Sequence, residues 1–187
     1  MVSAGYSATS GPARQSKPLL PMSSRPFRVL FVCLGNICRS PAAEVVCCAH
    51  LDRAGEQRVQ VDSCGTAAYH IGQRPDARML AALQRAGFVY GGHRARQFRR
   101  EDFARFDLII PQDEENQADL LALASTAEQK ARIVPMSRWF AAGEARREVP
   151  DPYYGDASDF DDVVSLLDAA MPGLLRDINA RLQRGEA

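Results

Sequence analysis

A cysteine and an arginine stand six positions apart in the stretch CLGNICRSP, residues 33–41. A thiol is nucleophilic as its thiolate, which a nearby guanidinium favours, and a guanidinium can also clamp two oxygens of a phosphoryl group. Gly35 and Asn36 lie between the two and tolerate backbone angles that let successive N–H groups converge on an anion. The spacing therefore predicts a loop in which Cys33 attacks a phosphate-like group held by Arg39.

Ser40 and Pro41 predict that a helix begins at the end of this loop. Serine is a favoured N-cap, and proline suits the first helical position because its missing N–H costs nothing there. The positive end of the helix dipole would then face the bound anion. The alternative is that Cys33 is only a small buried side chain, since a pattern as short as this can arise by chance.

Asp151 is a candidate proton donor in VPDPYYGD, residues 149–156. Transfer of a phosphoryl group from an ester needs a proton for the leaving oxygen, and a carboxylic acid can supply it. Pro152 disfavours a helix at Asp151 and indicates a loop. The alternative interpretation of this stretch is an ordinary Asp-Pro turn.

Alternating strand-like and helix-like patterns would position these residues. Short β-branched or aromatic runs predict strands at 27–33, 58–63, 107–111 and 131–135. The segments between them predict helices at about 41–54, 76–86 and 114–129, with a short turn near 100–105, and a last helix follows that ends at Gly185. Ser158 is the expected N-cap of the last helix. This alternation predicts one α/β domain, with an open, twisted parallel sheet of about four strands and helices on both faces. Ligands of such sheets bind beyond the carboxyl ends of the strands, where Cys33 is expected.

The composition limits the classes of partner. The chain has 187 residues, with 23 Lys and Arg balanced by 23 Asp and Glu, so nothing favours nucleic acid or an anionic membrane. Five cysteines do not resemble a secreted disulfide framework, and no stretch approaches the roughly 20 apolar residues of a membrane span. We expect a cytoplasmic protein, with export possible but without a signal peptide. Residues 1–26 are rich in Ser, Gly and Pro and predict a disordered extension before a domain at 27–187.

At these two motifs the sequence resembles the low-molecular-weight protein tyrosine phosphatases, over residues 27–184. The family's phosphate loop, Cys-x-Gly-Asn-x-Cys-Arg-Ser-Pro, is present at 33–41, and its acid motif, Asp-Pro-Tyr, begins at Asp151. SCGTAAYHIG (63–72) and HRARQ (93–97) are lesser markers. The chain departs from the family at PQDEEN (111–116), where Asp113 matches but an apolar residue commonly precedes it.

The resemblance implies a catalytic role for four residues. Cys33 would be the nucleophile that forms a phosphocysteine, and Arg39 the phosphate clamp. Ser40 would stabilise the thiolate. Asp151 would protonate the phenoxide and then deprotonate the water that hydrolyses the intermediate. Neither a metal nor a cofactor is implied.

The resemblance also implies binding and supporting residues. Asn36 would hold the loop in a left-handed shape, and the substrate site would comprise the loop and three aromatic walls: Leu34, Gly35, Asn36, Ile37, Cys38, Tyr69, Tyr153 and Tyr154. His93 would order the loop from behind, and Asp113 would support it. Cys38 would trap oxidised Cys33 as a disulfide, or else simply fill space.

Phosphotyrosine-bearing proteins, and a cognate tyrosine kinase among them, are the implied partners of a monomer. Three alternatives remain: an arsenate reductase, a phosphoarginine phosphatase and an inactive phosphate-binding module. The first needs further cysteines downstream, and none follows Cys64. The second carries a threonine where this chain has Ile37, and the third needs neither the thiolate nor the acid.

Overall fold

The computed structural model describes residues 25–186, so the predicted disordered extension, residues 1–26, lies outside the described residues except for its last two positions. Three parallel strands form the sheet in the order β2-β1-β3. They are β1 (Phe27–Cys33), β2 (Val59–Gly65) and β3 (Leu108–Pro111). The central strand β1 is almost wholly buried because its run FRVLFVC has apolar side chains for both faces.

The register of the strands brings their carboxyl ends to one edge. Cys33 is the partner of Gly65 on β2, and Val32 is the partner of Pro111 on β3. The loops after all three strands therefore meet at the end of β1, which is where the sequence predicted a ligand.

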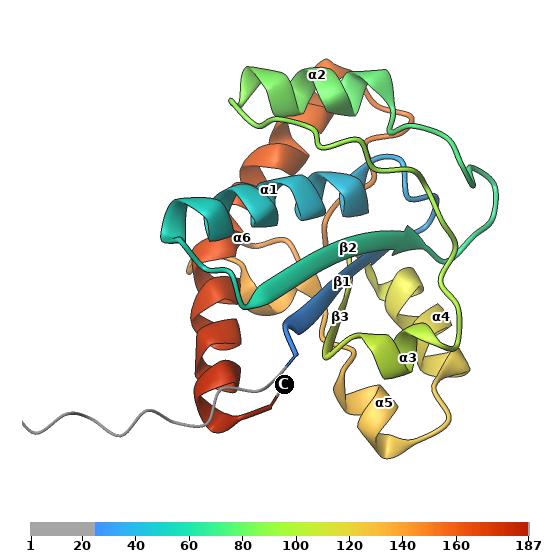
Figure 1. The fold of residues 1–187 in the computed structure, drawn as a ribbon. Coiled ribbons are helices and arrows are strands. Elements are labelled where there is room, and N and C mark those ends of the chain that lie inside the picture. The colour runs from blue at the N-terminus through green and yellow to red at the C-terminus, as the bar shows by residue number, and fades with distance from the viewer. Residues whose placement is uncertain (1–24, 187) are drawn as a thin grey trace, which may run out of the picture.

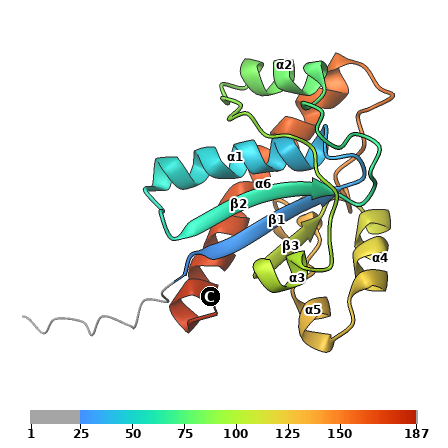
Figure 2. The same cartoon turned by 45° about the vertical axis from the view of Figure 1, so that its right-hand side comes forward.

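Helices cover the two faces of the sheet (Figures 1 and 2). On one face lie α1 (Arg39–Ala54) and α6 (Ala157–Arg184), with α2 (Ala77–Arg85) packed on α6. On the other side lie α3 (Asp102–Arg105), α4 (Glu114–Leu123) and α5 (Ala127–Ala131). A short 3-10 helix, η1 (Met136–Trp139), packs against α6.

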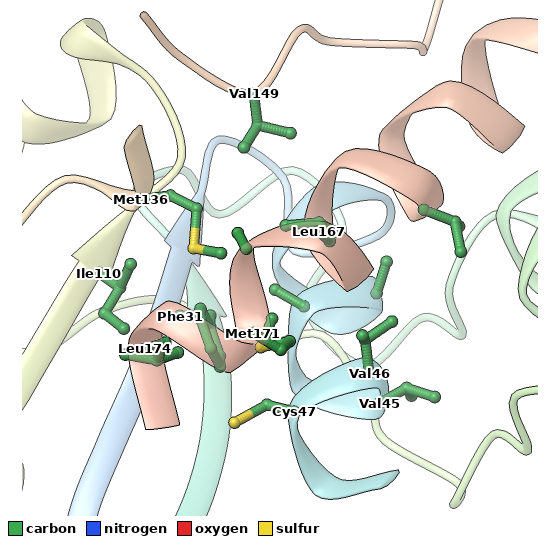
Figure 3. Packing of buried hydrophobic residues seen from close by; sticks show 14 of the residues in the cluster. Phe31, Val45, Val46, Cys47, Ile110, Met136, Val149, Leu167, Met171 and Leu174 are labelled. Atoms are coloured by element: carbon green, nitrogen blue, oxygen red, sulfur yellow. The ribbon is translucent and has the colours of Figure 1, made fainter. Parts of the chain in front are cut away.

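Each face has its own hydrophobic core, because alternate side chains of β1 point in opposite directions. Phe31 joins the first core with Cys47 of α1 and Leu167 and Met171 of α6, as Figure 3 shows. Leu30 joins the second core, which includes Phe103 and Leu120. The strand that ends at Cys33 is thus fixed from both sides.

The predicted α/β fold with an open parallel sheet is confirmed, with three strands. The run at 131–135 meets β3 only through one bridge, between Ile109 and Ile133. It is short because α5 ends at Ala131 and Pro135 precedes η1. No helix in residues 25–186 is long and apolar enough to cross a membrane.

The last helix begins earlier than its predicted cap. Asp156, not Ser158, is the N-cap of α6, and it forms a capping box with Asp159. The Asp156 side chain accepts a hydrogen bond from the backbone N–H of Ser158, so the serine lies inside the first turn. This cap fixes the end of the loop that carries Asp151.

Candidate active site

The loop between β1 and α1 is built around Asn36. It is the one non-glycine residue with positive φ (55°) in the described part of the chain, and its side chain is fully buried. Its Nδ2 donates to Ser40 Oγ and to Ser63 Oγ, both at 2.9 Å. Its Oδ1 accepts from the backbone N–H of Arg96 and from His93 Nε2, also at 2.9 Å. These four bonds hold the residue in a conformation that costs free energy for a residue with a Cβ.

Helix α1 begins at Arg39, with Cys38 as an N-cap that makes no side-chain hydrogen bond. The prediction that Ser40 caps this helix is therefore wrong. Its hydroxyl instead lies 3.1 Å from Cys33 Sγ and 3.1 Å from the carbonyl oxygen of Cys64. The backbone N–H of Asn36 also donates to Cys33 Sγ, at 3.3 Å. The sulfur at the end of β1 thus has two neighbours that can donate to a thiolate.

Arg39 is buried between two carboxylates. Its Nη1 donates to Asp113 Oδ2 and, at 3.3 Å, to the carbonyl oxygen of Val149, while its Nη2 donates to Asp151 Oδ2 at 2.7 Å. Burial acts to lower the pKa of Arg39, but the negative charges of Cys33, Asp151 and Asp113 outweigh it and raise that pKa. The guanidinium is therefore a fixed cation at the base of the site.

A cavity of about 260 Å³ lies above these groups. It is lined by three of the four predicted catalytic residues and most of the predicted binding residues: Cys33, Leu34, Gly35, Ile37, Cys38, Arg39, Tyr69, Asp151, Tyr153 and Tyr154. Asn36, Ser40, His93 and Asp113 are not among its lining residues. Asn36, Ser40 and Asp113 each contact a lining residue, whereas His93 contacts Asn36. Tyr154 is almost fully exposed, and its ring meets that of Tyr153 edge-on, 5.0 Å between centroids. The cavity thus extends from the buried sulfur of Cys33 to exposed tyrosine rings at its mouth.

The profile of the family described as low molecular weight phosphotyrosine protein phosphatase matches residues 28–184. A putative low molecular weight protein-tyrosine-phosphatase of Synechocystis is 46% identical over 157 residues, which cover 83% of this chain and 99% of the relative. The chain belongs to this family. The predicted resemblance and the predicted enzyme class, a protein-tyrosine phosphatase, are therefore confirmed.

A second relative of this phosphatase and a solved structure support the same family. Low molecular weight protein-tyrosine phosphatase A of Mycobacterium tuberculosis is 40% identical over 164 residues, which cover 86% of this chain and 97% of the relative. A crystal structure of a protein tyrosine phosphatase from Entamoeba histolytica, with Hepes in its active site, superposes with a TM-score of 0.77 at 34% identity. That match covers 86% of this chain and 99% of the other.

Two residues at the phosphatase site were missed by the sequence reasoning. His70 lines the cavity, and its ring lies against Gly35: a Cβ placed on that glycine would be 2.9 Å from His70 Cδ2. Its position directly after Tyr69, inside the marker SCGTAAYHIG, was the available signal. Glu44 of α1 lies behind the loop, where its Oε2 accepts from Ser63 Oγ at 2.7 Å and lies 3.2 Å from His93 Nδ1. No motif pointed to Glu44.

Glu44 and His93 lie behind the loop, and the pKa of each is shifted toward its neutral form. Burial raises the pKa of Glu44 to about 7, against a smaller opposing effect of the Ser63 hydrogen bond. Burial also lowers the pKa of His93. His93 Nε2 bonds to Asn36 Oδ1, so the histidine lies where the sequence predicted a residue that orders the loop from behind.

Cys38 is buried next to the site. Burial raises the pKa of its thiol far above the usual range, and the nearby charges of Asp76, Cys33 and Asp151 add to this effect. The thiol at rest is therefore protonated and unreactive. Its expected role as a resolving thiol stays a prediction.

Proposed function

We propose that this phosphatase hydrolyses protein phosphotyrosine through a phosphocysteine on Cys33. One observation carries the proposal: Cys33, Arg39 and Asp151 line a single cavity whose mouth is aromatic. A nucleophile, a cation and an acid are the three groups that the chemistry requires. Cys33 and Arg39 come from one loop, and Asp151 comes from a segment 112 residues after Arg39. The tyrosine side chains that line the cavity suit an aryl ring.

In the first half-reaction the Cys33 thiolate attacks phosphorus. The bond between phosphorus and the tyrosine oxygen breaks, and a proton from Asp151 passes to that oxygen, so a neutral phenol leaves. The thiolate is stabilised by the N–H of Asn36 and the hydroxyl of Ser40, which lie 3.3 and 3.1 Å from the sulfur. Arg39 and the backbone N–H groups of the loop hold the equatorial oxygens.

In the second half-reaction water attacks the phosphocysteine. The Asp151 carboxylate takes a proton from the water, the bond between phosphorus and sulfur breaks, and inorganic phosphate leaves with the thiolate restored. Arg39 must exchange its contact with Asp151 for one with the phosphoryl group in each cycle. Its second partner, Asp113, is fixed because it also caps α4 through the N–H of Asn116, and so keeps the guanidinium in place.

The site is complete within one chain, which supports a monomer as the active form. The five cysteines are free thiols, which supports a reducing location such as the cytoplasm. The substrates would be phosphotyrosine-bearing proteins, including a cognate tyrosine kinase. Residues 27–187 would form the catalytic domain.

Leaving-group dependence tests the assigned acid. Asp151→Asn should slow hydrolysis of phenyl phosphate far more than that of an ester with a good leaving group, because only the poor leaving group needs the proton. Cys33→Ser should abolish turnover while phosphate still binds. Asp161→Asn is a matched control, since Asp161 is an exposed carboxylate paired with Arg85 outside the cavity. Equal slowing of both esters by Asp151→Asn would reject the assignment.

Substrate class, inhibition by a transition-state mimic and metal use need three further measurements. Turnover on phosphotyrosine, phosphoarginine and arsenate should be compared side by side, with phosphotyrosine expected to dominate. Vanadate should inhibit as a mimic of the transition state. Hydrolysis should survive a chelator, because arginine and backbone amides do the clamping; loss of activity in EDTA would overturn that expectation.

A further inference from the structure

Three side chains of metal-binding type converge behind the phosphate loop, outside the catalytic cavity. They are Glu44 of α1, Asp62 of β2 and His93 of the segment before α3, and one ligand atom of each lies within 4.8 Å of the others. They come from three separate parts of the chain, so their convergence is a product of the fold. The proposed catalytic cycle uses neither carboxylate.

The ring of His93 presents one nitrogen to the other two side chains of this cluster. Its side chain is nine-tenths buried, with 9% exposure. Its Nε2 forms hydrogen bonds with Asn36 Oδ1 at 2.9 Å and with Ser63 Oγ at 3.5 Å. Because Asn36 Oδ1 is an acceptor, Nε2 carries the proton and Nδ1 of the neutral ring presents a lone pair.

That lone pair faces a second acceptor. Nδ1 lies 3.2 Å from Glu44 Oε2, which also accepts a hydrogen bond from Ser63 Oγ. An imidazole lone pair and a carboxylate oxygen at this distance repel unless a cation lies between them. A proton meets that need, and so does a metal ion.

We propose that Glu44, Asp62 and His93 form a binding site for one divalent cation of the Zn²⁺ class, separate from the catalytic centre. Zinc takes imidazole nitrogen and carboxylate oxygen at about 2.0–2.2 Å, so two ligands of a tetrahedral site lie roughly 3.3–3.5 Å apart. The separation of Glu44 Oε2 and His93 Nδ1, 3.2 Å, is close to that edge. Asp62 is one-third exposed, and to reach the metal it must exchange its contacts with the backbone N–H of Ser63 and with Arg96. Water would complete the coordination.

An outer shell of hydrogen bonds already orients these ligands. Ser63 Oγ donates to Glu44 Oε2 at 2.7 Å, and Asn36 holds the far nitrogen of the histidine. Such partners fix the tautomer and the ring orientation of a metal-bound histidine. Arg96 binds Asp62 Oδ2 at 2.8 Å, but its charge is shared with Asp102, which lies 3.0 Å from its other nitrogen. Asp102 is also paired with Arg105 at 3.3 Å, so it offsets only part of the repulsion that Arg96 would exert on a cation.

Metal binding at this site would strengthen a hydrogen bond that holds the phosphate loop. An imidazole bound to a metal through Nδ1 is a stronger donor at Nε2, and that proton goes to Asn36, the residue with positive φ. Binding should therefore stabilise the folded chain by mass action and slow opening of the loop. The inference stands whether or not the proposed catalytic roles are correct.

Binding should be measured on the full chain carrying Cys33→Ser, so that the active-site sulfur cannot hold the metal. After treatment with EDTA and its removal, Zn²⁺ and Co²⁺ are titrated at pH 8, followed by calorimetry, melting temperature and the Co²⁺ spectrum. We expect one ion per chain, a raised melting temperature, and a cobalt spectrum without a thiolate charge-transfer band. Glu44→Gln should weaken binding at least about a hundredfold, since even outer-shell losses cost about 10–100-fold.

Two further variants decide the location. Asp62→Asn, at a partly exposed position, should also weaken binding and guards against a folding defect in Glu44→Gln. Asp168→Asn is the matched control, because Asp168 forms another close contact with a histidine, His50, at 2.6 Å on the helical face. It should leave binding unchanged. The proposal is overturned by absence of binding, by a thiolate band, by equal affinity in Glu44→Gln and Asp62→Asn, or by a loss confined to Asp168→Asn.

Discussion

Gly65→Ala should distort the phosphate loop from the neighbouring strand. Gly65 is the last residue of β2 and the partner of Cys33 in the sheet register. A Cβ at this position would lie 2.5 Å from the carbonyl oxygen of Leu34 and 3.2 Å from the N–H nitrogen of Asn36, against 3.4–4 Å for ordinary contacts. The strand cannot retreat easily, because the N–H and C=O of Gly65 are bonded to Arg96 and Phe98.

The size of the effect follows from that clash. Raising 2.5 Å to at least 3.4 Å requires the loop and strand to separate by about 0.9 Å. A misplacement of about 1 Å in an active site can cost roughly a hundredfold in rate, and overpacking a buried site costs about 1–3 kcal/mol of stability. We therefore expect kcat/KM on an aryl phosphate to fall by about a hundredfold, in a protein that still folds. Steady-state kinetics and urea denaturation measure the two quantities.

Gly91→Ala is the matched control for this substitution. A Cβ on Gly91 meets nothing within 4 Å, and no positive φ strains an alanine there. Its activity and stability should equal those of the unchanged chain. If Gly65→Ala also kept its activity within about twofold, contact between the end of β2 and the loop would not position the reacting groups, and the reasoning would fail.

Two other substitutions test buried groups near the site. Gln112→Met should raise the free energy of unfolding by about 1–2 kcal/mol in urea, because Gln112 is 1% exposed and its Oε1 lacks a partner among the described residues; a loss of stability would contradict this. Burial raises the pKa of Glu44 to about 7. The free energy of unfolding that this protonated side chain contributes is therefore fully present below about pH 4.5 and is lost as the pH rises through 7, by about 3 kcal/mol in total. Glu44→Gln should flatten this dependence in melting curves taken with EDTA, and an unchanged pH profile would count against it.

The sequence predicted the parts of the site that depend on local spacing. Cys33, Asn36 and Arg39 are fixed relative to one another by a tight turn between a strand and a helix. Such a turn can be predicted from its residue types, because few residues tolerate its backbone conformation. The parallel sheet also followed, because strand and helix patterns alternate along the chain. The predicted fourth strand, residues 131–135, is reduced to one bridge at Ile133. The apolar run alone does not show that α5 and η1 flank it and limit its length.

Contacts between distant segments could not be predicted in this way. Ser40 matched the pattern of a helix N-cap. In the structure its hydroxyl instead contacts Cys33 Sγ and the carbonyl oxygen of Cys64, which lies on the neighbouring strand β2. Glu44 looked like any polar residue of a helix. Its role arises only because β2 and the segment at His93 pack against that helix, and nothing in the sequence near Glu44 records this.

The two carboxylates on Arg39 differ in a way that bears on the proposed cycle. The side chain of Asp113 is 15% exposed and also caps α4, whereas that of Asp151 is 44% exposed and lies in a loop. An ion pair in contact with water is worth little, so the pair with Asp151 is the easier one to open. A phosphoryl dianion entering the cavity would therefore displace Asp151 and leave Asp113 in place. In the proposed cycle this displacement would free Asp151 beside the leaving oxygen when Arg39 takes the phosphate, so one exchange of partners would both bind the substrate and release the acid.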